Sequence, residues 1–225
     1  MGHNEEVLFF LPVPSQAVPP SPRVLYTVGH SNLDFIEFLK LLKDGGVELL
    51  VDVRSRPQSA RFPQFSQQVL ERSLENESIS YLFLGEELGG RPDAPDAYRP
   101  DGLVDYRVRR KSYAFRSGLD RVLMELEQRP LALMCAEEDP LECHRFLMIC
   151  PELVRDGVHP LHIRKGSRIE TQEAAETRLL ASQGFGDVAE NTLFPDARAE
   201  VLEQAYDLQA GKFAFRVDPM AVDRW

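Results

Sequence analysis

Short apolar runs alternate along the chain with segments whose apolar residues recur at helical spacing. The apolar runs, each the length of a buried strand, cover residues 23–28, 47–53, 79–84, 131–135 and 158–163. Helical patterns cover residues 33–43, 66–76 and 106–128, and another helix is predicted to begin near residue 140. Strands that alternate with helices are typical of a mainly parallel sheet with helices on both faces. We therefore predict an α/β fold with a five-stranded sheet.

Residues at the predicted helix ends indicate where the helices begin and stop. Ser31 or Asn32 is expected to cap the first helix, and Gly45 is expected to end it, because these residue types satisfy the free backbone groups of a helix. Gly118 is expected to interrupt the helix over 106–128, since glycine disfavours a helix interior.

The chain divides into three parts. Residues 1–22 contain five prolines and are predicted to form an extended arm. Residues 23–164 form the α/β domain. Residues 165–225 form a helical C-terminal extension. A capping box at 167–170 is expected to open a first helix that runs to residue 182. Residues 184–195 are expected to connect it to a second helix over 197–209. These C-terminal helices could pair two copies of the chain in a homodimer.

Composition and net charge argue against some classes of binding partner. The chain has 225 residues, 43% of them hydrophobic, and a formal net charge of -10. An acidic chain is a poor match for a broad nucleic-acid or anionic-membrane surface. The apolar run at 7–13 lacks the basic start of a secretion signal, and three cysteines cannot all pair within one chain. We therefore expect a cytoplasmic protein that is not bound to a membrane.

Chemically capable side chains follow the predicted strands. In parallel sheets, ligands bind beyond the carboxyl ends of the strands, so we expect these residues to line one cleft. The candidate catalytic residues are Cys135, His144, Glu137 and His30, and the candidate ligand-binding residues are Ser31, Arg54, Arg61, Gly89, Gly90, Cys143 and Arg145.

The richest segment is 131–145, where a strand ends at Cys135. Asp139 is expected to cap the next helix, with Pro140 in its first position. Cys143, His144 and Arg145 would then lie near the positive end of the helix dipole, which favours thiolates and anions. On this interpretation Cys135 is a nucleophile or redox thiol of lowered pKa. The alternative is a small buried side chain, which is favoured for Cys143 and more strongly for Cys150.

The other candidates also have two interpretations. His30, His144 or Glu137 could move protons, whereas a histidine at a turn often only caps or donates a hydrogen bond. Arg54, Arg61 and Arg145 could clamp a phosphate or carboxylate, or could form salt bridges to neighbours such as Asp52, Glu86 or Glu137. Gly89 and Gly90 could instead form only a tight turn. The basic residues Arg107, Arg109, Arg110 and Lys111 are expected to form a solvated helix face.

A soft metal site could be built from Cys135, Cys143 and a histidine. The chain has no Cys-x-x-Cys pair of the kind usual in zinc sites. We assign no metal from the sequence, and the cofactor stays open.

The motifs in this order resemble the domain of unknown function family 488. The resemblance covers residues 26–163 and rests on 27–31 (TVGHS), 50–55 (LVDVRS), 61–65 (RFPQF), 84–90 (LGEELGG), 132–137 (ALMCAE), 143–145 (CHR) and 162–163 (HI). It implies one α/β domain with these motifs at a shared site. It implies no activity, because none is established for the family.

A weaker likeness is to rhodanese and cysteine-phosphatase domains, in which a strand-end cysteine leads through a loop to a helix bearing an arginine. Here the loop from Cys135 to Arg145 carries Glu137, Glu138, Asp139 and Glu142, and their charge would repel an anion.

Together these features predict an enzyme, a hydrolase or transferase, that binds a small phosphate- or nucleotide-like anion at the strand ends. The alternative is a non-catalytic module that binds a ligand, a metal or a nucleic-acid end. A rhodanese-like sulfurtransferase is the third hypothesis.

Overall fold

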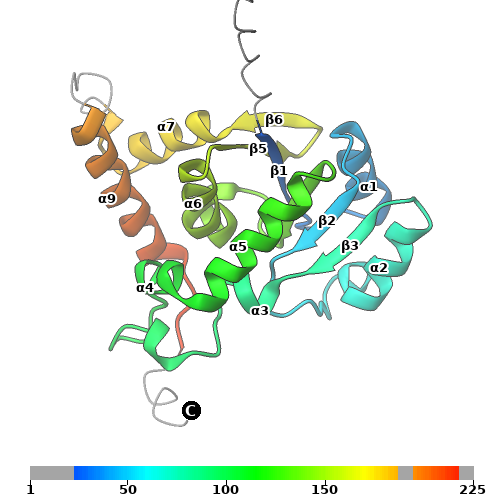
Figure 1. Ribbon diagram of the computed structural model, residues 1–225, viewed down its shortest axis with the longest axis horizontal. Coiled ribbons are helices and arrows are strands. Elements are labelled where there is room, and N and C mark those ends of the chain that lie inside the picture. Colours follow the sequence, from blue (N-terminus) through cyan, green and yellow to red (C-terminus); the bar gives the residue numbers. More distant parts are fainter. Residues whose placement is uncertain (1–22, 187–194, 218–225) are drawn as a thin grey trace, which may run out of the picture.

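The computed structural model describes residues 23–186 and 195–217, which form an α/β fold around one sheet (Figure 1). The strands are β1 (Arg23–Gly29), β2 (Leu49–Asp52), β3 (Ser80–Phe83), β4 (Leu131–Cys135), β5 (Val158–Arg164) and β6 (Arg168–Thr171). Their order across the sheet is β3-β2-β4-β1-β5-β6. All neighbours are parallel except β5 and β6. The predicted α/β fold is confirmed, with one strand more than expected.

Helices cover both faces of the sheet (Figure 1). They are α1 (Phe35–Asp44), α2 (Gln67–Glu75), α3 (Gly85–Leu88), α4 (Tyr106–Lys111), α5 (Tyr113–Leu126), α6 (Cys150–Arg155), α7 (Gln172–Ser182) and α9 (Pro195–Phe213). Helix α9 packs against α7. No helix in the described ranges is long and apolar enough to cross a membrane.

Successive residues of the central strands contribute alternately to two hydrophobic clusters, one on each face of the sheet. Leu49 and Val51 of β2 belong to one buried cluster, together with Phe115 of α5. Leu50 belongs to the other cluster, together with Phe38 of α1. Successive strand residues point to opposite faces, so an uninterrupted apolar run is what a strand covered on both sides requires.

The sixth strand corrects the prediction for residues 167–170. These residues do not open a helix; β6 folds back antiparallel on β5, after a turn in which Gly166 and Ser167 both have positive φ. Helix α7 begins only after β6, where the Thr171 side chain accepts from the Ala174 N–H. The sheet therefore extends beyond residue 164.

Two predicted helix boundaries were wrong. Asp34, rather than Ser31 or Asn32, caps α1 in a capping box with Glu37, whereas Gly45 ends the helix as predicted. The long helix predicted over 106–128 is interrupted at Ser112, which caps α5, and not at Gly118. Gly118 lies inside α5, where an added Cβ would be 2.7 Å from the Glu87 side chain, so glycine permits close helix packing there.

The segment after β4 is less regular than the helix that was predicted to begin near residue 140. Asp139 accepts from the Leu141 N–H and caps a 3-10 turn, Pro140–Glu142, as its residue type suggested. A π-helical turn, Arg145–Ile149, follows and leads into α6. Pro151 lies in the first turn of α6, directly after the π-helical turn.

The basic residues of α4 form the predicted solvated face only in part, because Arg107 and Lys111 are exposed but the other two are not. Arg109 and Arg110 are buried. Arg109 donates to the carbonyl oxygens of Glu86 and Glu87, and Arg110 lies 3.5 Å from a carboxylate oxygen of Glu152. These arginines tie α4 to its neighbours.

The predicted arm at 1–22 lies outside the described residues, as does most of the predicted connector at 184–195. The second C-terminal helix, α9, is longer than the predicted 197–209.

Candidate functional site

The loops that follow β1, β2 and β4 meet at one edge of the sheet. The backbone N–H of His30 donates to the Cys135 carbonyl oxygen at 3.0 Å. A Cβ at Gly29 would be 1.7 Å from the Glu137 carbonyl oxygen, so this close approach of two loops requires glycine. Because β4 lies between β1 and β2, the strand-end residues converge as the sequence predicted.

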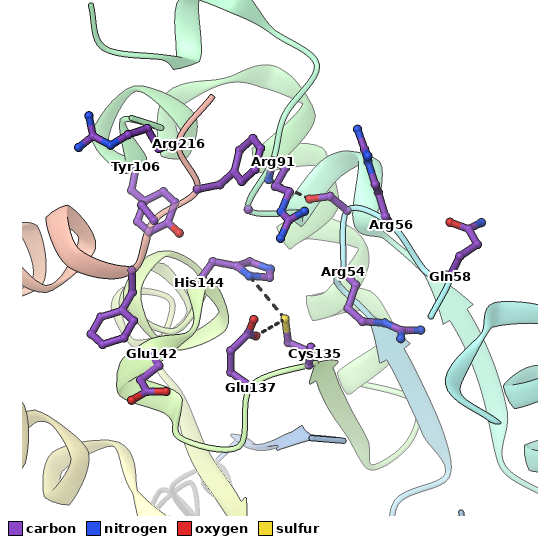
Figure 2. A pocket seen from close by; sticks show the side chains of 16 residues that line it. Arg54, Arg56, Gln58, Arg91, Tyr106, Cys135, Glu137, Glu142, His144 and Arg216 are labelled. Atoms are coloured by element: carbon purple, nitrogen blue, oxygen red, sulfur yellow. Dashed lines mark hydrogen bonds between the residues drawn. The ribbon is translucent and has the colours of Figure 1, made fainter. Parts of the chain in front are cut away.

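Two adjoining pockets open along this edge. The first has a volume of about 540 Å³ and contains Cys135, Glu137 and His144 (Figure 2). The second, of about 640 Å³, contains His30, Ser31 and Arg61. Five residues line both pockets: Arg54, Arg56, Gln58, Ala136 and Glu137. Most of the candidates therefore line two adjoining pockets of a size typical for small-molecule sites.

Cys135 stands between a carboxylate and an imidazole. Its Sγ lies 3.0 Å from Oε2 of Glu137 and 3.6 Å from Nδ1 of His144 (Figure 2). A second sulfur, that of Cys143, lies 3.8 Å from the same Nδ1. Cys135 is 4% exposed and Cys143 only 1%, and Cys135 is the thiol that lines the pocket.

The His144 ring is held from two sides. Its Nε2 lies 3.0 Å from the Val53 carbonyl oxygen at the end of β2. Behind the ring is Gly90, where an added Cβ would be 2.9 Å from Cγ of His144. These contacts direct Nδ1 toward the two sulfurs, which is the orientation that a base or a metal ligand needs.

The two thiols ionise as a pair, and the pKa of Cys135 is not lowered as the nucleophile interpretation expected. Burial and the neighbouring Cys143 thiol raise the pKa of Cys135. Burial would also raise the pKa of Cys143, but its contact with Cys135 and the charges of Arg145 and His144 outweigh burial and lower it. Interacting sites share their protons, so the ionisation is a property of the cysteine pair and not of the pocket-lining Cys135 alone.

Glu137 and His144 also have shifted pKa values. Glu137 is exposed to the pocket, yet the surrounding protein removes enough water from its carboxyl group to raise its pKa, to which Cys143 adds. Burial works against a charge on His144, but the neighbouring Cys143 more than compensates, and the pKa of His144 is raised. Both groups can therefore hold a proton beside the thiols.

His30 lies beside this cluster and not within it. Its ring stacks on Phe65 at a centroid distance of 4.3 Å, Nδ1 lies 3.0 Å from the Ser31 carbonyl oxygen and Nε2 lies 3.3 Å from Arg54. Burial and the Arg54 charge lower its pKa to about 4. His30 is thus a neutral ring at neutral pH with both nitrogens occupied, which matches the hydrogen-bonding alternative.

Arg54 forms the salt bridge to Asp52 that was the alternative to an anion clamp. Its NH2 lies 2.6 Å from Oδ2 of Asp52, and both side chains are buried. The same Asp52 oxygen accepts from the Tyr81 hydroxyl at 2.7 Å. Arg54 therefore forms a wall of both pockets, and Asp52 already balances its charge.

Arg145 does not line either pocket. It is fully buried, and its guanidinium donates to the carbonyl oxygens of Glu137 and Glu138 at 2.7 and 3.0 Å and to the Thr27 hydroxyl at 3.3 Å. This geometry does not support a direct anion contact. Arg145 instead holds the loop that positions Glu137.

The remaining predicted residues have mixed positions. Ser31, with φ 45°, and the exposed Arg61 line the second pocket, and the Arg61 guanidinium lies over the Phe62 ring. At Gly89 an added Cβ would be 2.2 Å from the Gly85 carbonyl oxygen. Close packing of the backbone therefore requires glycine at this position, and this favours the structural alternative for Gly89 over ligand binding.

Sequence reasoning missed three arginines and a C-terminal segment at the first pocket. Arg56, Arg91 and Arg216 line it, as do residues 213–215. Figure 2 shows the Arg91 guanidinium directed into the pocket, while that of Arg216 points away. Arg91 lies over the Phe215 ring, 4.5 Å from its centroid. Arg56 could have been noticed in the arginine-bearing loop after β2, but nothing local indicates that residues 213–216 reach this pocket.

Comparison with known proteins identifies a family. The family model "Domain of unknown function DUF488" matches residues 34–149, more than half of the chain. Curated proteins give no match. Among solved structures, a DUF442 protein from Shewanella putrefaciens is 8% identical, with a TM-score of 0.33 over 87% of this chain and 91% of that one. The chain belongs to the DUF488 family.

Proposed function

We propose that this DUF488 protein is an enzyme, a hydrolase or transferase, that binds a small phosphate- or nucleotide-like anion in the first pocket. The observation that carries this proposal is that the Cys135 thiol contacts both an imidazole and a carboxyl group in a pocket that arginines also line. A nucleophile beside a base, in a concave site, is the arrangement that covalent catalysis requires.

The charges that line the pocket support an anionic ligand. Arg56 and Arg91 are exposed and take part in none of the salt bridges among the described residues, unlike Arg54. A guanidinium without a carboxylate partner can bind a phosphate in bidentate fashion. Because Glu137 and Glu142 also line the pocket, the ligand must place its charge near the arginine side.

The proposed reaction uses groups in contact with Cys135. Nδ1 of His144 takes the thiol proton, and the sulfur attacks the phosphorus or acyl carbon of the ligand. The bond to the leaving oxygen breaks, and that oxygen takes a proton from Glu137. Water, or an acceptor alcohol in a transferase, then gives a proton to Glu137 and attacks the group bound to sulfur. The bond to sulfur breaks, and the sulfur takes its proton back from His144.

A screen of phosphate monoesters, nucleotides and acyl esters tests the proposal. Cys135→Ser should abolish any turnover found, while Arg91→Ala should mainly raise KM. Cys150→Ala is the matched control, because Cys150 is buried in α6 away from both pockets. Turnover that survives in Cys135→Ser would contradict the assigned nucleophile.

The binding-module alternative predicts a different result. A ligand would bind with the same affinity to the wild type and Cys135→Ser, and neither would form product. A sulfurtransferase would, after incubation with thiosulfate, carry one additional sulfur atom on Cys135 that reductant removes. Absence of that adduct by mass spectrometry would exclude the third hypothesis.

A further inference from the structure

Three soft donor atoms converge beneath the pocket, more than a thiol–imidazole pair needs. Sγ of Cys135, Sγ of Cys143 and Nδ1 of His144 all lie within 4.8 Å of one another. A neutral imidazole nitrogen has one lone pair, which can accept one S–H hydrogen bond. The second sulfur, at 3.8 Å from the same nitrogen, therefore has no separate role in a hydrogen-bonded dyad.

The spacing of these atoms matches a tetrahedral metal centre. Bond lengths to Zn²⁺ of about 2.3 Å for sulfur and about 2.0 Å for nitrogen place neighbouring donors about 3.6 Å apart for a sulfur–nitrogen pair. The two sulfur–nitrogen distances here are 3.6 and 3.8 Å. Little movement of either cysteine toward His144 is needed.

The surroundings already orient the donors. Nε2 of His144 donates to the Val53 carbonyl oxygen at 3.0 Å, which is the outer contact that metal-binding histidines usually make. Cys135 ends β4, and Cys143 ends the 3-10 turn Pro140–Glu142, so two separate elements hold the sulfurs. The Glu137 carboxyl group, 3.0 Å from Sγ of Cys135, lies beside this cluster and does not belong to it.

We propose that Cys135, Cys143 and His144 bind a soft divalent cation, Zn²⁺ by ligand preference, as its three protein ligands. Thiolate and imidazole donors select zinc over magnesium or calcium. Binding holds both cysteines as thiolates and releases any remaining thiol proton to solvent. The next step rests on the proposed function, in which Cys135 is the nucleophile. A bound metal occupies the electron pair of the Cys135 sulfur and so prevents its attack on the ligand.

Cobalt provides a direct test. The full chain is purified under reducing conditions, stripped with a chelator, and titrated with Co²⁺ alone. We expect a sulfur-to-cobalt charge-transfer band with tetrahedral visible bands that saturates at one ion per chain and is abolished by Zn²⁺. Cys143→Ser and His144→Gln should each lose the charge-transfer intensity or weaken binding about tenfold or more. The Cys150→Ala control, which changes the third cysteine, should bind as the wild type does.

Several outcomes would overturn the metal site. These are absence of a charge-transfer band in the wild type, an unchanged titration in both folded variants, or loss of the band in Cys150→Ala. Circular dichroism checks that each variant folds. If Cys143→Ser does not fold, His144→Gln decides the result.

A second measurement separates this inference from the proposed function. Alkylation of Cys135 by iodoacetamide, read by peptide mass spectrometry, should slow about tenfold or more when one Zn²⁺ is bound. This readout needs no substrate. If metal protects the thiol but no anion binds and no turnover is found, the proposed function fails while the metal site stands. If turnover depends on Cys135 but Co²⁺ does not bind, the metal site fails while the proposed function stands.

Discussion

Nε2 of His144 lies 3.0 Å from the carbonyl oxygen of Val53. A carbonyl oxygen only accepts hydrogen bonds, so Nε2 carries the proton of the neutral ring, and Nδ1 directs its lone pair at Cys135. One backbone contact from β2 thus decides which histidine nitrogen faces the thiols.

We expect the neutral His144 ring to be the Nε2–H tautomer. Nitrogen-15 NMR of the labelled, metal-free protein distinguishes the two ring nitrogens, with His144→Gln used to assign the signals. A neutral ring protonated at Nδ1 would contradict the role of Val53.

Gly90→Ala should disturb the site without unfolding the protein. The new Cβ would be 2.9 Å from Cγ of His144, so the imidazole must move away from the thiols. We expect slower alkylation of Cys135 and a weaker cobalt spectrum. Gly211→Ala is the matched control, because no atom lies within 4 Å of its added Cβ. Equal effects of the two substitutions would refute the contact.

Asp52→Asn should destabilise the fold strongly. It removes the charge that balances buried Arg54 and weakens the acceptor of the Tyr81 hydroxyl. Loss of one partner of a buried ion pair costs about 3–5 kcal/mol, to be measured by urea unfolding. Glu125→Gln, which weakens the i,i+4 pairs of Glu125 on α5, should cost about 1 kcal/mol or less. A comparable loss in both variants would count against this interpretation of Asp52 and Arg54.

Stability should fall between neutral and acidic pH partly because of His162. Burial and the Arg145 charge lower its pKa from 6.5 to about 4, while Thr27 and Gln172 hydrogen-bond its ring. Between these two values the unfolded chain binds more protons than the folded protein, so protonation favours unfolding as pH falls from 6.5 toward 4. The contribution is about 2–3 kcal/mol at pH of about 4.5.

The measurement compares urea unfolding of the wild type and His162→Gln at neutral and acidic pH. The variant should lose less stability on acidification. His30, whose pKa is also lowered to about 4, remains in both proteins and does not affect the difference. Parallel pH profiles would show that His162 is not responsible.

Local sequence determined five of the six strands and the edge of the sheet at which the site lies. Apolar runs such as 131–135 are long enough for a strand and too short for an ordinary helix, and each is followed by a polar motif. Parallel strands bring their carboxyl ends to one edge, so Cys135, His30 and Arg54 could be predicted to converge. Asp139 and Gly45 were predicted correctly for a similar reason, since caps act within a few residues.

Only the tertiary structure decided the role of each side chain at that edge. Whether Arg145 meets solvent or backbone carbonyls depends on how the loop at 137–138 folds over it. The arrival of Phe215 beneath Arg91 depends on where α9 packs. The pairing of Cys135 with Cys143 depends on a 3-10 turn where a helix was predicted to begin. Hydrogen bonds, burial and charge act over a few ångströms in space, and residues that far apart in sequence carry no local signal of meeting.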